Sequence, residues 1–119
     1  MNSLRVLVID DDEATLRVMR LVLAQDGFSV ETASSRADAL AELSTRQPDV
    51  VVMDYQMGGL APELFIAQAK AAGLTAPILL CTGRREELGL LVDDVLVKPF
   101  DIDDLAARVR ALTGRSSAD

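Results

Sequence analysis

Polar residues stand at the ends of several hydrophobic runs that lie far apart in the chain. Asp10 and Asp11 end the first such run, Asp54 another, Thr82 a third and Lys98 the last. If these runs are neighbouring parallel strands, the polar side chains converge at the carboxyl edge of one sheet, where open α/β sheets bind ligands. Carboxylates together with a lysine suit a divalent metal ion and a phosphoryl group.

The segments between these residues predict the elements that position them. Strand-like and helix-like segments alternate along the chain, which implies right-handed β-α-β crossovers and a three-layer α/β sandwich. Strands are expected over residues 5–9, 28–33, 49–53, 77–81 and 95–97, and helices over residues 13–25, 35–47 and 62–73 and from residue 101 onward. The second strand alternates polar and apolar residues, so we expect it at an edge of the sheet.

The last helix and the chain ends complete this organisation. Ile102, Leu105, Val109 and Leu112 follow one another at spacings of three and four, so we expect them all on the inner face of a helix. Residues 4–113 are expected to form one domain, with a short tail over residues 1–3 and a disordered polar tail over residues 114–119.

The composition excludes several classes of protein. The chain has 119 residues, half of them hydrophobic, with no histidine and a net charge of −7. The negative charge argues against nucleic-acid binding, which depends on basic patches. No apolar stretch has the length of a membrane helix and no signal-peptide pattern is present, so we expect a cytoplasmic protein without a membrane partner. The single cysteine, Cys81, lies in an apolar run and is expected to be a small buried hydrophobe.

The acidic run after the first strand has two possible explanations. Asp12 and Glu13 suit a helix start, where acidic side chains satisfy free N–H groups and oppose the helix dipole. Asp10 and Asp11 stand at the strand end itself, where like charges cost stability unless a cation offsets them. Asp54 alone could simply mark the edge of the core. The combination with a hydroxyl and an ammonium at successive strand ends favours a functional site.

At this point the residues match a known family. The segments Val8-Ile9-Asp10-Asp11-Asp12, Val52-Met53-Asp54-Tyr55-Gln56-Met57, Leu80-Cys81-Thr82-Gly83 and Val97-Lys98-Pro99-Phe100 resemble the motifs of two-component response-regulator receiver domains. The resemblance covers residues 4–113. It implies a CheY-like, flavodoxin-like fold whose five-stranded parallel sheet has the order 2-1-3-4-5.

The resemblance also implies a role for each site residue. Asp54 would be the phosphoacceptor, Asp11 a direct Mg²⁺ ligand and Asp10 a ligand through water, and the backbone carbonyl of Gln56 would complete the metal shell. Thr82 would donate its hydroxyl to the phosphoryl oxygens. Lys98 would form an ion pair with the phosphoryl group, and the peptide bond between Lys98 and Pro99 would be cis. Gly83 would leave room for a phosphodonor or an attacking water.

Some positions depart from the family pattern. The loop after Asp54 reads Met57-Gly58 and has its proline only at Pro62, so we expect greater loop mobility. Val95 replaces the usual aromatic residue of the fifth strand, which puts the common Thr-aromatic switch in doubt. Residues 84–94 are shorter than the corresponding family segment, so the family's fourth helix is expected to be short or absent.

Three functional hypotheses follow. The leading one is a stand-alone, Mg²⁺-dependent phosphoacceptor that is not an enzyme with a separate substrate; its partners would be a histidine kinase or phosphotransfer protein and an unidentified downstream protein. The second is a haloacid-dehalogenase-type phosphatase. That motif requires Asp-x-Asp-Gly-Thr, whereas the chain lacks the glycine and threonine after Asp12, and its later acids could only be Asp103 and Asp104. The third is a degenerate receiver that binds a partner without phosphorylation.

Overall fold

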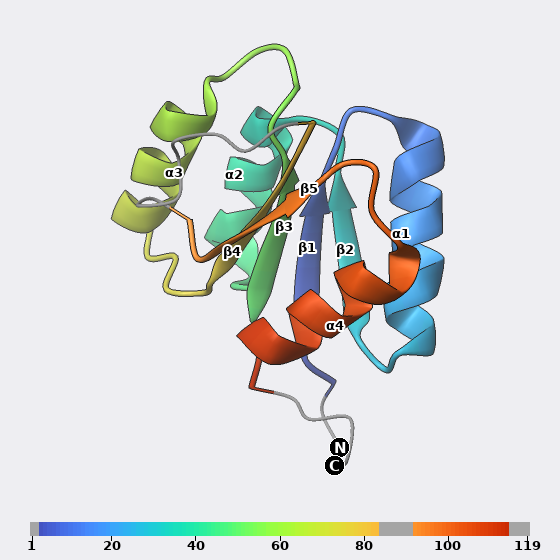
Figure 1. Ribbon diagram of the computed structural model, residues 1–119. Helices are drawn as coiled ribbons and strands as arrows, with labels where there is room; N and C mark the ends of the chain where they lie inside the picture. The colour runs from blue at the N-terminus through green and yellow to red at the C-terminus, as the bar shows by residue number, and fades with distance from the viewer. Residues whose placement is uncertain (1–2, 84–91, 115–119) are drawn as a thin grey trace.

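The fold is a parallel sheet covered by helices on both faces (Figure 1). The computed structural model describes residues 3–83 and 92–114. In chain order its elements are β1 (Arg5–Ile9), α1 (Glu13–Gln25), β2 (Ser29–Ala33), α2 (Arg36–Thr45), β3 (Val50–Asp54), α3 (Pro62–Ala71), β4 (Ile78–Thr82), β5 (Asp94–Val97) and α4 (Ile102–Leu112). The expected alternation of strands and helices is confirmed.

The order of the strands determines which of them can hold a buried site. The sheet has the order β2-β1-β3-β4-β5, and each neighbouring pair is parallel. This is the flavodoxin-like order, and β2 lies at an edge as its alternating sequence predicts. Because all strands run in the same direction, their carboxyl ends meet at one edge, which is the upper edge in Figure 1.

Alternation along the strands divides the core into two layers. One layer packs β-strand residues such as Ile9, Met53 and Leu80 against α2 and α3. The other layer packs strand residues such as Val8 and Cys81 against α1 and α4. Successive side chains point to opposite faces of a strand, so a continuous apolar run serves both layers. Most of the side chains in both layers are aliphatic, and each layer also holds one buried phenylalanine, Phe65 in the first and Phe28 in the second.

Local signals in the sequence account for the helix starts. The Asp12 carboxylate accepts hydrogen bonds from the backbone N–H and the hydroxyl of Thr15, which caps α1. The hydroxyl of Ser35 accepts from the Asp38 N–H at 3.0 Å and caps α2. Pro62 stands in the first turn of α3, where its missing N–H costs nothing. The expected structural role of Asp12 is therefore confirmed.

The structure corrects two details of the predicted elements. Asp54 and Thr82 are the last residues of β3 and β4 and do not follow them, because ladder hydrogen bonds extend one residue beyond each apolar run. The expectation that Ile102 faces the core is wrong. It is 38% exposed at the first position of α4, whereas Leu105 and Val109 are fully buried.

Several expectations fall outside the described residues. The predicted shortening of the family's fourth helix concerns mainly residues 84–91, and the predicted tails concern mainly residues 1–2 and 115–119. Over residues 3–83 and 92–114, none of the helices is long and apolar enough to cross a membrane. Val95, at the position of the family's aromatic residue, is buried in the layer that faces α2 and α3.

Candidate functional site

Three acidic side chains form a cluster at the carboxyl edge of the sheet. Asp10 follows β1, Asp11 is the next residue, and Asp54 ends β3, the strand beside β1. One carboxylate oxygen from each residue lies within 4.8 Å of the other two. Asp10 and Asp54 are buried and Asp11 is exposed, so the cluster opens to solvent on one side. The predicted convergence of these acids is confirmed.

Asp10 is held in place by its own backbone surroundings. Its N–H donates to the carbonyl of Ala33 at 3.1 Å, which continues the pairing of β1 with β2. Its carboxylate accepts the N–H of Asp12 at 3.0 Å. Burial raises the pKa of Asp10 above its ordinary value, and the nearby charge of Asp54 adds to this effect, while the hydrogen bond from Asp12 opposes it. The side chain is therefore fixed in position and costly to ionise in the metal-free protein.

Lys98 reaches the cluster from the end of β5. Its Nζ lies 2.7 Å from Oδ1 of Asp54 and donates a hydrogen bond to it. Burial by itself lowers the pKa of the Lys98 ammonium, but the hydrogen bond and charge of Asp54 outweigh burial, so the pKa is raised. The peptide bond between Lys98 and Pro99 is cis, as the family resemblance implies. The site thus holds one ammonium beside three carboxylates.

Thr82, Gly83 and Gln56 line the same edge of the sheet. Thr82 is fully buried at the end of β4, and its carbonyl accepts the N–H of Lys98 at 2.7 Å. Gly83 is exposed, and a Cβ added to it would lie 3.9 Å from Oε1 of Gln56. A side chain at position 83 would therefore make ordinary van der Waals contact with the side-chain amide of Gln56.

Sequence reasoning missed one residue beside the site. Arg36, the first residue of α2, is 1% exposed and donates to backbone carbonyls of the loop between β3 and α3. Burial lowers the pKa of its guanidinium, and the charge of Asp54 opposes this shift. A cation in the first turn of a helix is disfavoured by the helix dipole. That mismatch is the signal in the sequence that could have drawn attention to Arg36.

The donor set fits a hard divalent cation. Carboxylate and carbonyl oxygens are the ligands that Mg²⁺ prefers, and its small octahedral shell usually retains several waters. Among the described residues, the three acids within 4.8 Å outnumber the neighbouring cations Lys98 and Arg36, and a further cation would offset the excess of negative charge. An exposed Asp11 beside the buried Asp10 and Asp54 leaves a solvent-facing side for water ligands.

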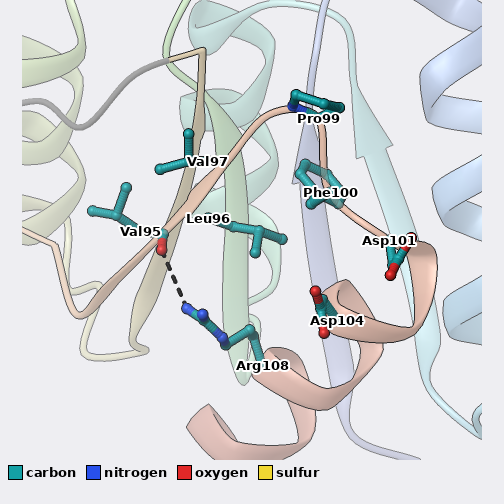
Figure 2. Close-up of a pocket in the computed structure, with 8 residues that line it drawn as sticks. All are labelled: Val95, Leu96, Val97, Pro99, Phe100, Asp101, Asp104 and Arg108. Atoms are coloured by element: carbon teal, nitrogen blue, oxygen red, sulfur yellow. Dashed lines mark hydrogen bonds between the residues drawn. The ribbon is translucent and has the colours of Figure 1, made fainter.

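A second concave surface lies apart from this cluster. A groove of about 440 Å³ lies along β5 and the first turns of α4. Its lining, drawn as sticks in Figure 2, consists of Val95, Leu96, Val97, Pro99, Phe100, Asp101, Asp104 and Arg108. Arg108 donates to the Val95 carbonyl at 3.2 Å and to both carboxylate oxygens of Asp94 at 2.9 and 3.0 Å. The lining includes none of the clustered acids, so the groove is a separate surface.

Comparison with known proteins agrees with this fold. Residues 6–110 match the family described as the response regulator receiver domain, and the chain belongs to this family. Among curated relatives, Response regulator MprA of Mycobacterium sp. (strain KMS) is 39% identical over 97% of this chain and 53% of its own length. Response regulator MprA of Mycobacterium tuberculosis (strain ATCC 25177 / H37Ra) is 37% identical over 98% and 54%. The chain spans about half the length of these relatives.

Solved structures show the same architecture. The response regulator receiver domain (CheY-like) from Methylobacillus flagellatus has a TM-score of 0.84 and 25% identity, over 93% of this chain and 99% of that chain. The response regulator protein TrrA from Thermotoga maritima, solved in complex with Mg(2+)-BeF, has a TM-score of 0.81 and 25% identity, over 92% of this chain and 98% of that chain.

Proposed function

We propose that this chain accepts a phosphoryl group on Asp54 from a histidine kinase or a histidine phosphotransfer protein, and that the reaction depends on Mg²⁺. The observation that carries the proposal is the assembly of Asp10, Asp11 and Asp54 within 4.8 Å, with the ammonium of Lys98 2.7 Å from Asp54. Membership of the receiver family supports it. The structure of TrrA with Mg(2+)-BeF concerns that protein and is an analogy for this one.

The chemistry follows from the residue types at the site. A carboxylate oxygen of Asp54 attacks the phosphorus of the donor's phosphohistidine and forms the new P–O bond. The P–N bond breaks, and its electron pair leaves with the donor imidazole. Lys98 exchanges its hydrogen bond to Asp54 for one to a phosphoryl oxygen, and the Thr82 hydroxyl donates to another. Positioning and charge stabilisation supply most of the catalysis. The product is a reactive acyl phosphate.

The metal would be held by the acids and by one backbone carbonyl. Asp11 would bind Mg²⁺ directly, Asp10 through water, Asp54 through its carboxylate, and Gln56 through its backbone carbonyl. Held there, Mg²⁺ would supply positive charge to offset the negative charge of the phosphoryl oxygens. Gly83 is exposed and has no side chain, so it would leave room for the donor or for the water that later hydrolyses the acyl phosphate.

The output is a contact with another protein or onward transfer of the phosphoryl group. The expectation of a stand-alone domain stays a prediction, because the chain spans about half of its curated relatives. The phosphatase alternative is not favoured, because Asp103 and Asp104 open α4 and lie outside the acid cluster found in the described residues. The assembled acids likewise favour a phosphorylated receiver over a degenerate one.

Labelled acetyl phosphate with Mg²⁺ tests the identity of the phosphoacceptor. The Asp54→Asn protein should take up no hydroxylamine-sensitive label while keeping the parent's circular dichroism spectrum. The matched control is Asp103→Asn, which removes an exposed aspartate of α4 and should label at the parent rate. Uptake by the Asp54→Asn protein at the parent rate would contradict the assignment. Loss of uptake in the Asp103→Asn protein alone would favour the phosphatase reading.

A further inference from the structure

Arg36 binds the loop between β3 and α3 through both Nη atoms of its guanidinium, while its buried Nε has no hydrogen-bond partner. Its Nη1 donates to the carbonyls of Leu60 at 2.6 Å and, more weakly, of Met57 at 3.4 Å. Its Nη2 donates to the carbonyls of Asp54 at 3.1 Å and Tyr55 at 2.7 Å. These bonds use all of the Nη hydrogens. A buried cation is costly unless its donors are satisfied, so the loop must keep its carbonyls in this arrangement.

One carbonyl in the middle of this set points elsewhere. The N–H of Met57 donates to the carbonyl of Tyr55 at 3.1 Å, the same oxygen that accepts from Arg36. The peptide bond between Gln56 and Met57 is trans, since the cis bond found in the described residues is Lys98–Pro99. In a trans peptide the C=O points opposite to the N–H. The Gln56 carbonyl is therefore directed away from Tyr55 O and from the guanidinium.

We propose that Arg36 is a positioning residue for the metal site, because it fixes the peptide groups on both sides of Gln56 and so presents the Gln56 carbonyl as a Mg²⁺ ligand. The inference rests on the proposed function. Arg36 touches neither the metal nor the phosphoryl group; it acts through the loop. The loop lacks the family's proline after Met57 and has two successive glycines, Gly58 and Gly59, so a side chain from α2 supplies the constraint.

Charge and positioning predict opposite effects of removing Arg36. As a cation close enough to interact with Asp54 and Asp11, Arg36 repels a second cation, so its charge alone weakens Mg²⁺ binding. If charge were its main influence, replacing Arg36 would tighten Mg²⁺ binding. If it positions the Gln56 carbonyl, replacement weakens binding, because partners that orient metal ligands typically contribute about 10-fold to 100-fold in metal affinity. A purely structural role would leave the affinity of the folded protein unchanged.

Calorimetric titration of Mg²⁺ into the metal-free protein tests the proposal. Arg36→Met keeps about the same buried volume and removes the guanidinium with its N–H donors. Arg36→Lys keeps the charge but cannot donate to all of the carbonyls. Both variants should bind Mg²⁺ about 10-fold to 100-fold more weakly than the parent. The matched control is Arg110→Met, which breaks a partly buried ion pair with Asp26 at 2.8 Å. That pair joins the last turns of α4 and α1, away from the carboxyl edge, so the control should retain the parent affinity.

The outcomes separate this inference from the proposed function. Failure of the parent to bind Mg²⁺ would overturn both. Parent binding with an unchanged or tighter affinity in the Arg36 variants would overturn the positioning role alone. If Arg36→Met does not fold, Arg36→Lys carries the same comparison. As a second measurement, ethylguanidinium added to an Arg36→Ala protein should restore Mg²⁺ affinity, because it replaces the missing part of the arginine side chain. No restoration at saturating ethylguanidinium would also overturn the positioning role.

Discussion

Asp10 shows what the acid cluster costs the metal-free protein. Its side chain is 3% exposed, and it lies beside two further carboxylates with no cation of its own within hydrogen-bonding distance among the described residues. Burial raises its pKa, and the charge of Asp54 raises it further. Ionised Asp10 therefore destabilises the fold near neutral pH. This is a common situation at functional sites, where a ligand rather than the apo structure offsets the charge.

The pH dependence of stability should reveal this cost. Because the folded pKa of Asp10 is above the ordinary value of 3.8, Asp10 favours the folded state at and below that value. This contribution is lost as the pH rises through the folded pKa. Asp10→Asn keeps an acceptor for the Asp12 N–H and removes the charge. It should therefore raise the free energy of unfolding of the metal-free protein at neutral pH. It should also make that free energy less dependent on pH between 3.8 and the folded pKa of Asp10. Urea unfolding measured against pH without Mg²⁺ provides the comparison.

A suitable control is Asp11→Asn, which also removes one charge from the cluster. Asp11 is exposed, so solvent already screens its charge and the gain should be smaller. If Asp10→Asn instead destabilises the metal-free protein, the Asp10 carboxylate stabilises the fold. Its buried charge would then not lower the free energy of unfolding.

At the scale of elements, the parallel strands explain why the site residues meet. β1, β3 and β4 lie side by side in the middle of the sheet, so the residues at their carboxyl ends are brought to one edge by the ladder. Continuous apolar runs predict such strands well, because both faces are buried. Strand ends are predicted less well, since backbone pairing continues through Asp54 and Thr82 whatever their side chains are.

Residues that act through tertiary contacts could not be predicted in the same way. Arg36 is a polar residue near a helix start in the sequence, and its burial depends on a loop some twenty residues further along the chain. Ile102 has the helical spacing of a core residue, but it stands at the helix end, where the chain turns from β5 into α4. It lies instead beside Val18 and Phe100 in a shallow apolar hollow between α1 and α4.

The different positions of Leu105 and Ile102 on α4 can be tested by stability. Leu105 is fully buried against the sheet, so Leu105→Ala should cost about 2–5 kcal/mol in the free energy of unfolding. Ile102→Ala removes a comparable side chain that is 38% exposed, and it should cost clearly less. Urea unfolding with unchanged m-values supplies both numbers. Equal losses would mean that Ile102 contributes to the core despite its exposure.

At the scale of the whole molecule, a ligand at the carboxyl edge should stabilise the entire fold. The acids and Lys98 belong to three different strands or strand ends, so an ion or phosphoryl group that binds them links distant parts of the chain. Such a site does not exist in the unfolded chain, and binding free energy therefore adds to folding free energy. The net charge of −7 also favours cation binding in general, so the measurement needs a site-specific comparison.

Lys98 provides that comparison, because its ammonium repels Mg²⁺ and attracts beryllofluoride, a negatively charged mimic of the phosphoryl group. In the parent, Mg²⁺ at 100 times its Kd should raise the free energy of unfolding by about 2.7 kcal/mol, and beryllofluoride should raise it further. Lys98→Ala removes a cation 2.7 Å from Asp54, so the Mg²⁺ increment should persist or grow while the beryllofluoride increment is largely lost. Lys70→Ala, at an exposed position of α3, should keep both increments, and EDTA should abolish them in every variant. Thermal unfolding of each protein in its metal-free, Mg²⁺ and Mg²⁺-beryllofluoride forms measures the increments. An equal loss of both in Lys98→Ala would mean that Lys98 supports the acid cluster as a whole and does not bind the phosphoryl group.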